Sequence, residues 1–133
     1  MEFWKKFFKY AAFWNWAFAA NGLIFPNLTL KIMGLSQSPG VGLFQAEFFG
    51  AVALFGLMYW WIHEDPASET AKKLVQLGII GKMLVFISFA IYYFSGKISI
   101  FGFLPTVGDF VFSIFFFAFL LFFRETPSQT THR

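Results

Sequence analysis

The sequence predicts an all-α protein, an antiparallel four-helix transmembrane bundle that forms a single domain over residues 1–133. The first observation is composition: 58% of the residues are hydrophobic and 13% are charged, which is too apolar for a soluble domain of this length. The second is pattern, since the apolar residues form four long stretches, about 7–25, 41–62, 72–94 and 105–123. Each stretch is close to the roughly 20 residues with which a helix crosses a bilayer.

The first stretch ends at Pro26, which cannot continue a helix because it lacks an amide hydrogen. Its basic beginning and the segment Ala17-Phe18-Ala19 also resemble a signal peptide with its cleavage site. Trp14, Asn15 and Trp16 are too bulky and too polar for the core of such a segment. We therefore expect a transmembrane helix here.

Between the first and second stretches lies an amphipathic segment, residues 27–35, which is too short to span a bilayer. We expect it to lie at the membrane interface. The second stretch then ends in Tyr59, Trp60 and Trp61, and aromatic residues of this kind favour the level of the lipid headgroups.

The third helix has a start signal at Asp65, an N-cap residue followed by proline at the first helical position. It is expected to end near Ser95 and Gly96. The fourth helix is expected to begin at Pro105, and a polar tail follows from Arg124.

The distribution of Lys and Arg predicts the orientation of the chain. One side of the predicted membrane carries Lys5, Lys6, Lys9, Lys72, Lys73, Arg124 and Arg133, and the other carries only Lys31 and Lys97. Because cytoplasmic loops are rich in basic residues, both termini of this multi-pass protein are expected to be cytoplasmic.

Small residues on the helices predict where other helices approach closely. The second helix carries Gly42, Ala46, Gly50 and Gly56 on one face, and the third carries Gly78. The first helix has a matching strip of Ala12, Asn15, Ala19 and Gly22. These are expected to be packing surfaces.

Polar and charged side chains occur inside all four stretches, where a charge is costly and usually faces protein or water. The candidates for an ion pair or a ligand-binding site are Asn15, Gln45, Glu47, Lys82, Asp109 and Ser113. Depth along the helices favours a contact of Lys82 with Glu47 over one with the shallower Asp109, with Gln45 or water bridging the gap.

Three interpretations of this polar group stay open. The charges form an ion pair that only fixes helix register, or they line a pocket that binds an ion, a proton or an amphipathic molecule, or one of them faces a partner protein.

Several chemistries are not indicated. The chain has no cysteine, so thiol chemistry of its own is excluded, and there is no phosphate loop or catalytic triad pattern. His63 is expected to be a solvated loop residue, and no metal site or cofactor motif is seen. The net charge of +3 is explained by basic residues in loops and chain ends, which suit membrane topology, and it indicates no nucleic-acid partner.

The plan resembles the DoxX-like set of small four-helix membrane proteins. The resemblance rests on the proline-closed first helix (Phe25-Pro26), the segment Met33-Gly34-Leu35, the charged and glycine-containing start of the second helix (residues 45–56), Lys82 and Asp109. It implies an accessory subunit of a membrane redox enzyme, an assembly factor, or a protein of another role.

The functional expectation is therefore a non-enzymatic accessory or assembly subunit of a membrane complex. Its partners would be the lipid bilayer and other membrane subunits or a second copy of the chain. The alternative is a small-ligand binder or proton-coupled transporter, which holds a small amphipathic ligand in an intramembrane pocket around Glu47 and Lys82. A membrane-embedded enzyme ranks third, because no nucleophile or metal set is evident.

Overall fold

A computed structural model describes residues 1–124 and contains five helices there: α1 (Glu2–Ile24), α2 (Pro26–Met33), α3 (Val41–Glu64), α4 (Glu69–Phe94) and α5 (Ile100–Arg124). The tail that the sequence predicts after Arg124 lies outside the described residues. Three of the helices, α3, α4 and α5, are long and apolar enough to cross a membrane. The regular structure of residues 1–124 is thus all helical, and the apolar helices indicate a membrane protein.

Helix α1 is 23 residues long but is not among these three. Lys9, Asn15 and Asn21 are distributed along it and lower its apolar character relative to the other long helices. Three of the four expected spans therefore meet the requirements of length and composition.

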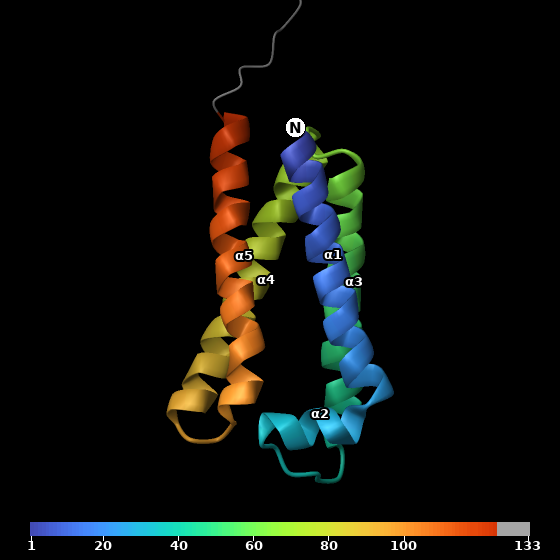
Figure 1. The fold of residues 1–133 in the computed structure, drawn as a ribbon, viewed down its shortest axis with the longest axis vertical. Helices are drawn as coiled ribbons and strands as arrows, with labels where there is room; N and C mark the ends of the chain where they lie inside the picture. The colour runs from blue at the N-terminus through green and yellow to red at the C-terminus, as the bar shows by residue number, and fades with distance from the viewer. Residues whose placement is uncertain (125–133) are drawn as a thin grey trace, which may run out of the picture.

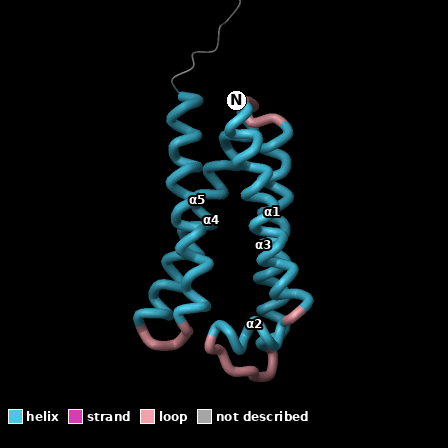
Figure 2. The backbone as a smooth tube through the Cα atoms, in the orientation of Figure 1, coloured by secondary structure: helices cyan, strands magenta, loops and turns pink. Residues whose placement is uncertain are grey.

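The four long helices form two pairs, and neighbours along the chain run in opposite directions (Figure 1). Helix α1 packs along α3, and α4 packs along α5. The pairs lie close together at the end that carries the N-terminus and separate toward the opposite end, where α2 lies across the opening (Figure 1). Loops are confined to the connections between helices (Figure 2).

Aromatic side chains join the two pairs at the end near the N-terminus. Phe8 on α1 stacks on Phe116 of α5 with ring centroids 5.3 Å apart, and it meets Phe119 edge-on at 5.1 Å. Trp4 contacts the same Phe119 ring at 5.3 Å. Such pairs add about 0.5–1.5 kcal/mol each to the burial of their surface. They form a closed core at this end of the molecule.

At the opposite end, α2 is tied to the beginning of α5. Ser99 donates its backbone N–H to the carbonyl of Met33 over 2.8 Å and its hydroxyl to the carbonyl of Ile32. Gly34, with a φ of 75°, ends α2 in the left-handed conformation that glycine adopts without strain. The short amphipathic segment thus connects the separated ends of the two helix pairs.

Two helix starts differ from the sequence prediction. Ser68 rather than Asp65 caps α4, because its hydroxyl accepts a hydrogen bond from the amide of Ala71 at 3.0 Å. Helix α5 begins at Ile100 and contains Pro105 within its length. The hydroxyl of Ser99 accepts from the amide of Gly102 at 3.2 Å, which satisfies one of the free donors of that first turn.

Candidate functional site

An ion pair joins α4 to α5 in the interior of the molecule. Lys82 Nζ lies 2.6 Å from Asp109 Oδ1, and the two side chains are only 5% and 18% exposed. Lys82 stands near the middle of α4, so both charges sit within helices that are long and apolar enough to cross a membrane. A charge at such depth is costly unless it is paired, and here each charge has the other as its partner.

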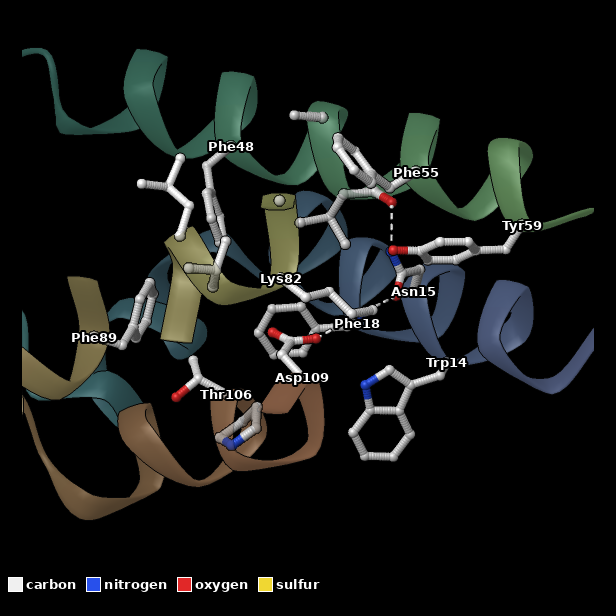
Figure 3. A pocket seen from close by; sticks show the side chains of 16 residues that line it. Trp14, Asn15, Phe18, Phe48, Phe55, Tyr59, Lys82, Phe89, Thr106 and Asp109 are labelled. Carbon is white, nitrogen blue, oxygen red and sulfur yellow. Dashed lines mark hydrogen bonds and ion pairs between the residues drawn. The ribbon is translucent and has the colours of Figure 1, made fainter. Parts of the chain in front are cut away.

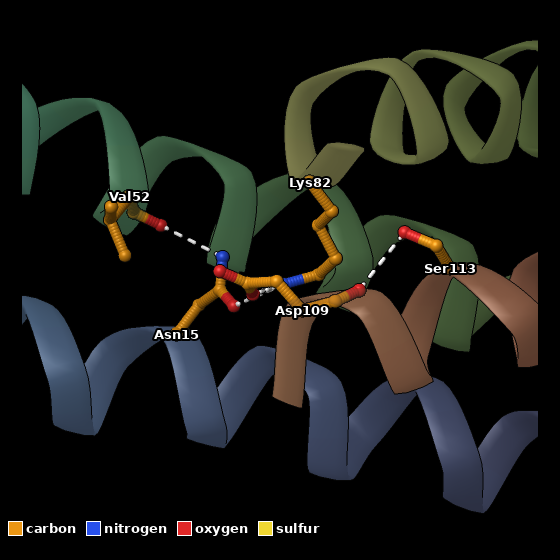
Figure 4. Close-up of polar contacts among 5 residues, drawn as sticks. All are labelled: Asn15, Val52, Lys82, Asp109 and Ser113. Carbon is orange, nitrogen blue, oxygen red and sulfur yellow. Dashed lines mark hydrogen bonds and ion pairs between the residues drawn. The ribbon is translucent and has the colours of Figure 1, made fainter. Parts of the chain in front are cut away.

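Asn15 connects this ion pair to the other two long helices. Its side-chain oxygen accepts from Lys82 Nζ at 3.3 Å, and its amide nitrogen donates to the carbonyl of Val52 on α3 at 3.2 Å. Figure 4 shows the resulting chain of contacts from α3 through α1 and α4 to α5. The amide is well suited to this position because it has both a donor and an acceptor.

The predicted contact of Lys82 with Glu47 is wrong. Glu47 is exposed on α3 and has no ion pair or hydrogen bond among residues 1–124. Gln45, which was expected to bridge the charges, is buried instead near the start of α3 and donates to the carbonyl of Pro26 at 2.9 Å. Two residues along a helix differ by about 200° in direction, so Gln45 and Glu47 cannot both face the interior.

The early start of α5 explains why Asp109 is the partner. Asp109 lies nine residues after Ile100, or about 14 Å along the axis, rather than four residues after an expected start at Pro105. The added depth brings it level with Lys82. Ser113, one turn further on, is buried and donates only to the backbone carbonyl of Asp109, at 2.9 Å.

Aromatic rings complete the surroundings of the ammonium group. Lys82 Nζ lies 5.4 Å from the ring centroid of Tyr59 and 5.1 Å from that of Phe112. Ring faces attract cations at such distances. The lysine is therefore held by one carboxylate, one amide oxygen and two rings.

A cavity of about 210 Å³ lies next to the ion pair and is lined by all four long helices (Figure 3). Its polar lining comes mainly from Asn15, Lys82, Thr106 and Asp109. Most of the remaining wall is apolar, and its aromatic members are Trp14, Phe18, Phe48, Phe55, Tyr59 and Phe89. The cavity therefore has a few polar groups in a mostly apolar lining.

Part of the cavity wall reaches the outside of the molecule. Leu84 and Trp14 line the cavity and are 66% and 46% exposed. They belong to α4 and α1, whose outer surfaces are rich in exposed apolar side chains. The cavity is therefore bounded in part by residues of the outer surface.

Tyr59 is a site residue that the sequence prediction missed, because it was expected at the headgroup level. It is fully buried, and its hydroxyl has no hydrogen-bond partner among the described residues. In Figure 3 it points toward Asn15 and Lys82. The signal was present in the sequence: Gln45, Phe49, Val52, Gly56 and Tyr59 are spaced alternately by four and three, which places them on one helix face.

The predicted packing glycines divide into two groups. A Cβ at Gly56 would lie 2.5 Å from Trp16 Nε1, and one at Gly78 would lie 3.0 Å from the Tyr59 ring, so both mark close packing. Gly42 and Gly50 have no atoms within 4 Å of that position, and Ala46 is exposed. The part of the predicted face formed by these last three residues does not pack within the chain.

The strip predicted on the first helix is buried in full, at Ala12, Asn15, Ala19 and Gly22. The prediction for His63 as a solvated loop residue is wrong. His63 lies in the last turn of α3, half-buried, with Nδ1 2.8 Å from the carbonyl oxygen of Lys5. It therefore joins the end of α3 to the start of α1.

Comparisons of this chain with protein-family models, with curated proteins and with solved structures found no match. The resemblance to the DoxX-like set accordingly stays a prediction, and the site has to be interpreted from its own geometry.

Proposed function

We propose that this membrane protein binds a small amphipathic molecule in the cavity between its two helix pairs. The observation that carries the proposal is the cavity itself, where the ion pair and Asn15 lie among aromatic and aliphatic walls. Mostly apolar pockets with a few convergent polar groups are typical ligand sites. The pocket predicted around Glu47 and Lys82 is thus centred on Asp109 and Lys82 instead.

The size of the cavity supports a small ligand. At about 210 Å³ it is larger than an engineered apolar cavity of about 150 Å³ that binds benzene. A ligand of about ten non-hydrogen atoms fits this space. Because Trp14 and Leu84 belong both to the wall and to the outer surface, such a molecule can reach the cavity sideways from the lipid.

Native mass spectrometry of protein extracted gently from its own membrane tests the proposal. Wild-type protein should carry a bound small molecule. Val85→Trp, which fills the cavity, should lose it, whereas the matched control Val111→Trp, at an exposed position of α5 that does not line the cavity, should retain it. Equal occupancy in the two variants would contradict binding in this cavity.

The exposed surface of α3 favours a second function, as an accessory or assembly subunit. Gly42, Ala46 and Gly50 leave an open face beside Glu47, whose carboxylate has no partner among residues 1–124. A partner helix could approach this face closely and supply a group that pairs with the carboxylate. Co-extracted subunits in the same spectra, lost on Glu47→Leu, would support this function, and a lone chain would contradict it.

For the topology, we propose that α1 also crosses the membrane, which gives four antiparallel transmembrane helices with cytoplasmic termini. Its position along α3 and the excess of basic residues at one end of the helices support this arrangement. The chain has no cysteine, so single cysteines report cleanly. In intact cells, a membrane-impermeant maleimide should label Lys97→Cys and leave Lys73→Cys unlabelled; the reverse result would overturn the orientation.

A further inference from the structure

The carboxylate of Asp109 has one oxygen that the ion pair does not use. Oδ1 accepts from Lys82 at 2.6 Å, and Oδ2 has no hydrogen-bond partner among the residues that the structure describes. It is not covered by neighbouring atoms either, because the fully covered side-chain atoms without a partner in residues 1–124 are Gln45 Oε1 and Tyr59 Oη. Asp109 also lines the cavity. Asp109 therefore brings a strong acceptor without a partner to the wall of a mostly apolar cavity (Figure 3).

Three donors of the cavity lining are engaged, and the two that are not, the Tyr59 hydroxyl and the Trp14 indole N–H, form no hydrogen bond with Asp109 among residues 1–124. Lys82 Nζ donates to Asp109 and to Asn15, the Asn15 amide donates to the carbonyl of Val52, and the hydroxyl of Thr106 donates to the carbonyl of Phe103. A buried carboxylate oxygen is stabilised by each donor that reaches it. No donor of residues 1–124 bonds Oδ2, so a molecule in the cavity can supply one.

The net charge of the site decides between a neutral and a charged donor. Lys82 and Asp109 compensate each other, and no other Asp, Glu, Lys, Arg or His among residues 1–124 lines the cavity. A cationic ligand would bring one uncompensated charge into an apolar space, and an anion would do the same and also repel the carboxylate. A neutral donor adds a charge-assisted hydrogen bond without changing this balance.

We propose that the ligand of this cavity is a neutral amphiphile with a hydroxyl head, which donates to Asp109 Oδ2 while its hydrocarbon body lies along the aromatic walls. This inference rests on the proposed function and specifies its ligand class. A hydroxyl is a common neutral group with a strong donor, and a ligand can carry it on an apolar body. The apolar lining by Phe18, Phe48, Phe55 and Phe89 suits a ring or a short chain.

Four probes of nearly equal shape test the proposal, each with fluorine at the para position for fluorine NMR. They are 1-phenylethanol, acetophenone, cumene and protonated 1-phenylethylamine, which present a neutral donor, an acceptor only, no polar group and a cation. Binding is measured to protein in nanodiscs, and partition into empty nanodiscs is subtracted. The alcohol should bind wild-type protein about tenfold more tightly than cumene, because it adds one hydrogen bond to a charged acceptor. The ketone and the ammonium ion should not share this gain.

A double variant, Lys82→Met with Asp109→Leu, replaces the ion pair by apolar side chains and so avoids an unpaired charge. It should bind cumene at least as well as wild-type protein does and should lose the preference for the alcohol. The control Lys72→Met with Glu69→Leu removes an exposed ion pair of similar length outside the cavity and should keep the preference.

The outcomes separate the two proposals. If no probe binds wild-type protein, both the ligand-binding function and the hydroxyl class are overturned. If cumene and the alcohol bind equally, or the ketone or the ammonium ion binds as tightly as the alcohol, the cavity binds ligands but the hydroxyl class is wrong. A preference that survives in the double variant at residues 82 and 109 also overturns the role of Asp109.

Discussion

Replacement of Lys82 by methionine is the most informative single change in this protein. Methionine keeps the length and flexibility of the side chain but removes the charge. Asp109 then loses its ion-pair partner, and no other hydrogen bond reaches its carboxylate among residues 1–124, since Ser113 bonds only the backbone carbonyl. Asn15 also loses the hydrogen bond that its side-chain oxygen accepts from Lys82.

The size of the effect follows from burial. The side chains are 5% and 18% exposed, so water screens the pair little. Removal of one partner of a buried pair costs about 3–5 kcal/mol, because the remaining charge is left uncompensated. We expect Lys82→Met to lower the free energy of unfolding by an amount near the lower end of this range, since Asp109 can still take up a proton.

Replacement of both partners should restore most of the loss. Lys82→Met with Asp109→Leu leaves no buried charge, and exchange of a buried pair for apolar side chains is often neutral or stabilising. The measurement is equilibrium unfolding in mixed micelles with increasing SDS, followed by circular dichroism. Lys72→Met serves as the control, because its partner Glu69 is 81% exposed and such pairs contribute about 0–1 kcal/mol.

The single changes Lys82→Met and Asp109→Leu and their combination form a double-mutant cycle, which can refute the proposed role of the ion pair. If the losses from the two single changes simply add in the double variant, the charges do not interact and the ion pair has no energetic role. A loss for Lys82→Met no larger than that for Lys72→Met would contradict the burial argument in the same way.

Three further predictions follow from individual contacts. Glu47→Gln should leave ligand occupancy and the unfolding midpoint of the isolated chain unchanged, because the carboxylate is exposed and outside the cavity; lower occupancy would return Glu47 to the site. Gly56→Ala should lower the free energy of unfolding by about 1–3 kcal/mol, since the added methyl group meets Trp16, whereas Gly50→Ala, with open space, should be neutral or stabilising by up to about 1 kcal/mol; equal effects would contradict the packing. Tyr59→Phe should raise the thermal midpoint of ligand-free protein, because it removes a buried hydroxyl without a partner, and a lower midpoint would mean that the hydroxyl is bonded.

Much of the local structure could be predicted from the sequence. The positions of the helices follow from apolar stretches and from breakers such as Pro26, and three of the four expected spans have the length and composition to cross a membrane. The buried strip of α1 was also predictable, because small and polar residues recur there at helical spacing. Helix starts were harder to predict, since several capping residues compete near each one. Helix α4 is capped by Ser68 and not by the predicted Asp65, and α5 starts after Ser99 and not at the predicted Pro105.

The composition and order of the chain by themselves determined a helical membrane protein with a few costly polar groups inside its helices, because hydrophobicity and helical periodicity are local properties. Which polar groups meet was decided only by the tertiary structure. The start of α5 sets the depth of Asp109, and the rotation of α3 turns Glu47 outward and Tyr59 inward. Depth and rotation depend on contacts between distant segments. These contacts pair Lys82 with Asp109 rather than with Glu47, and they leave a cavity between the two helix pairs.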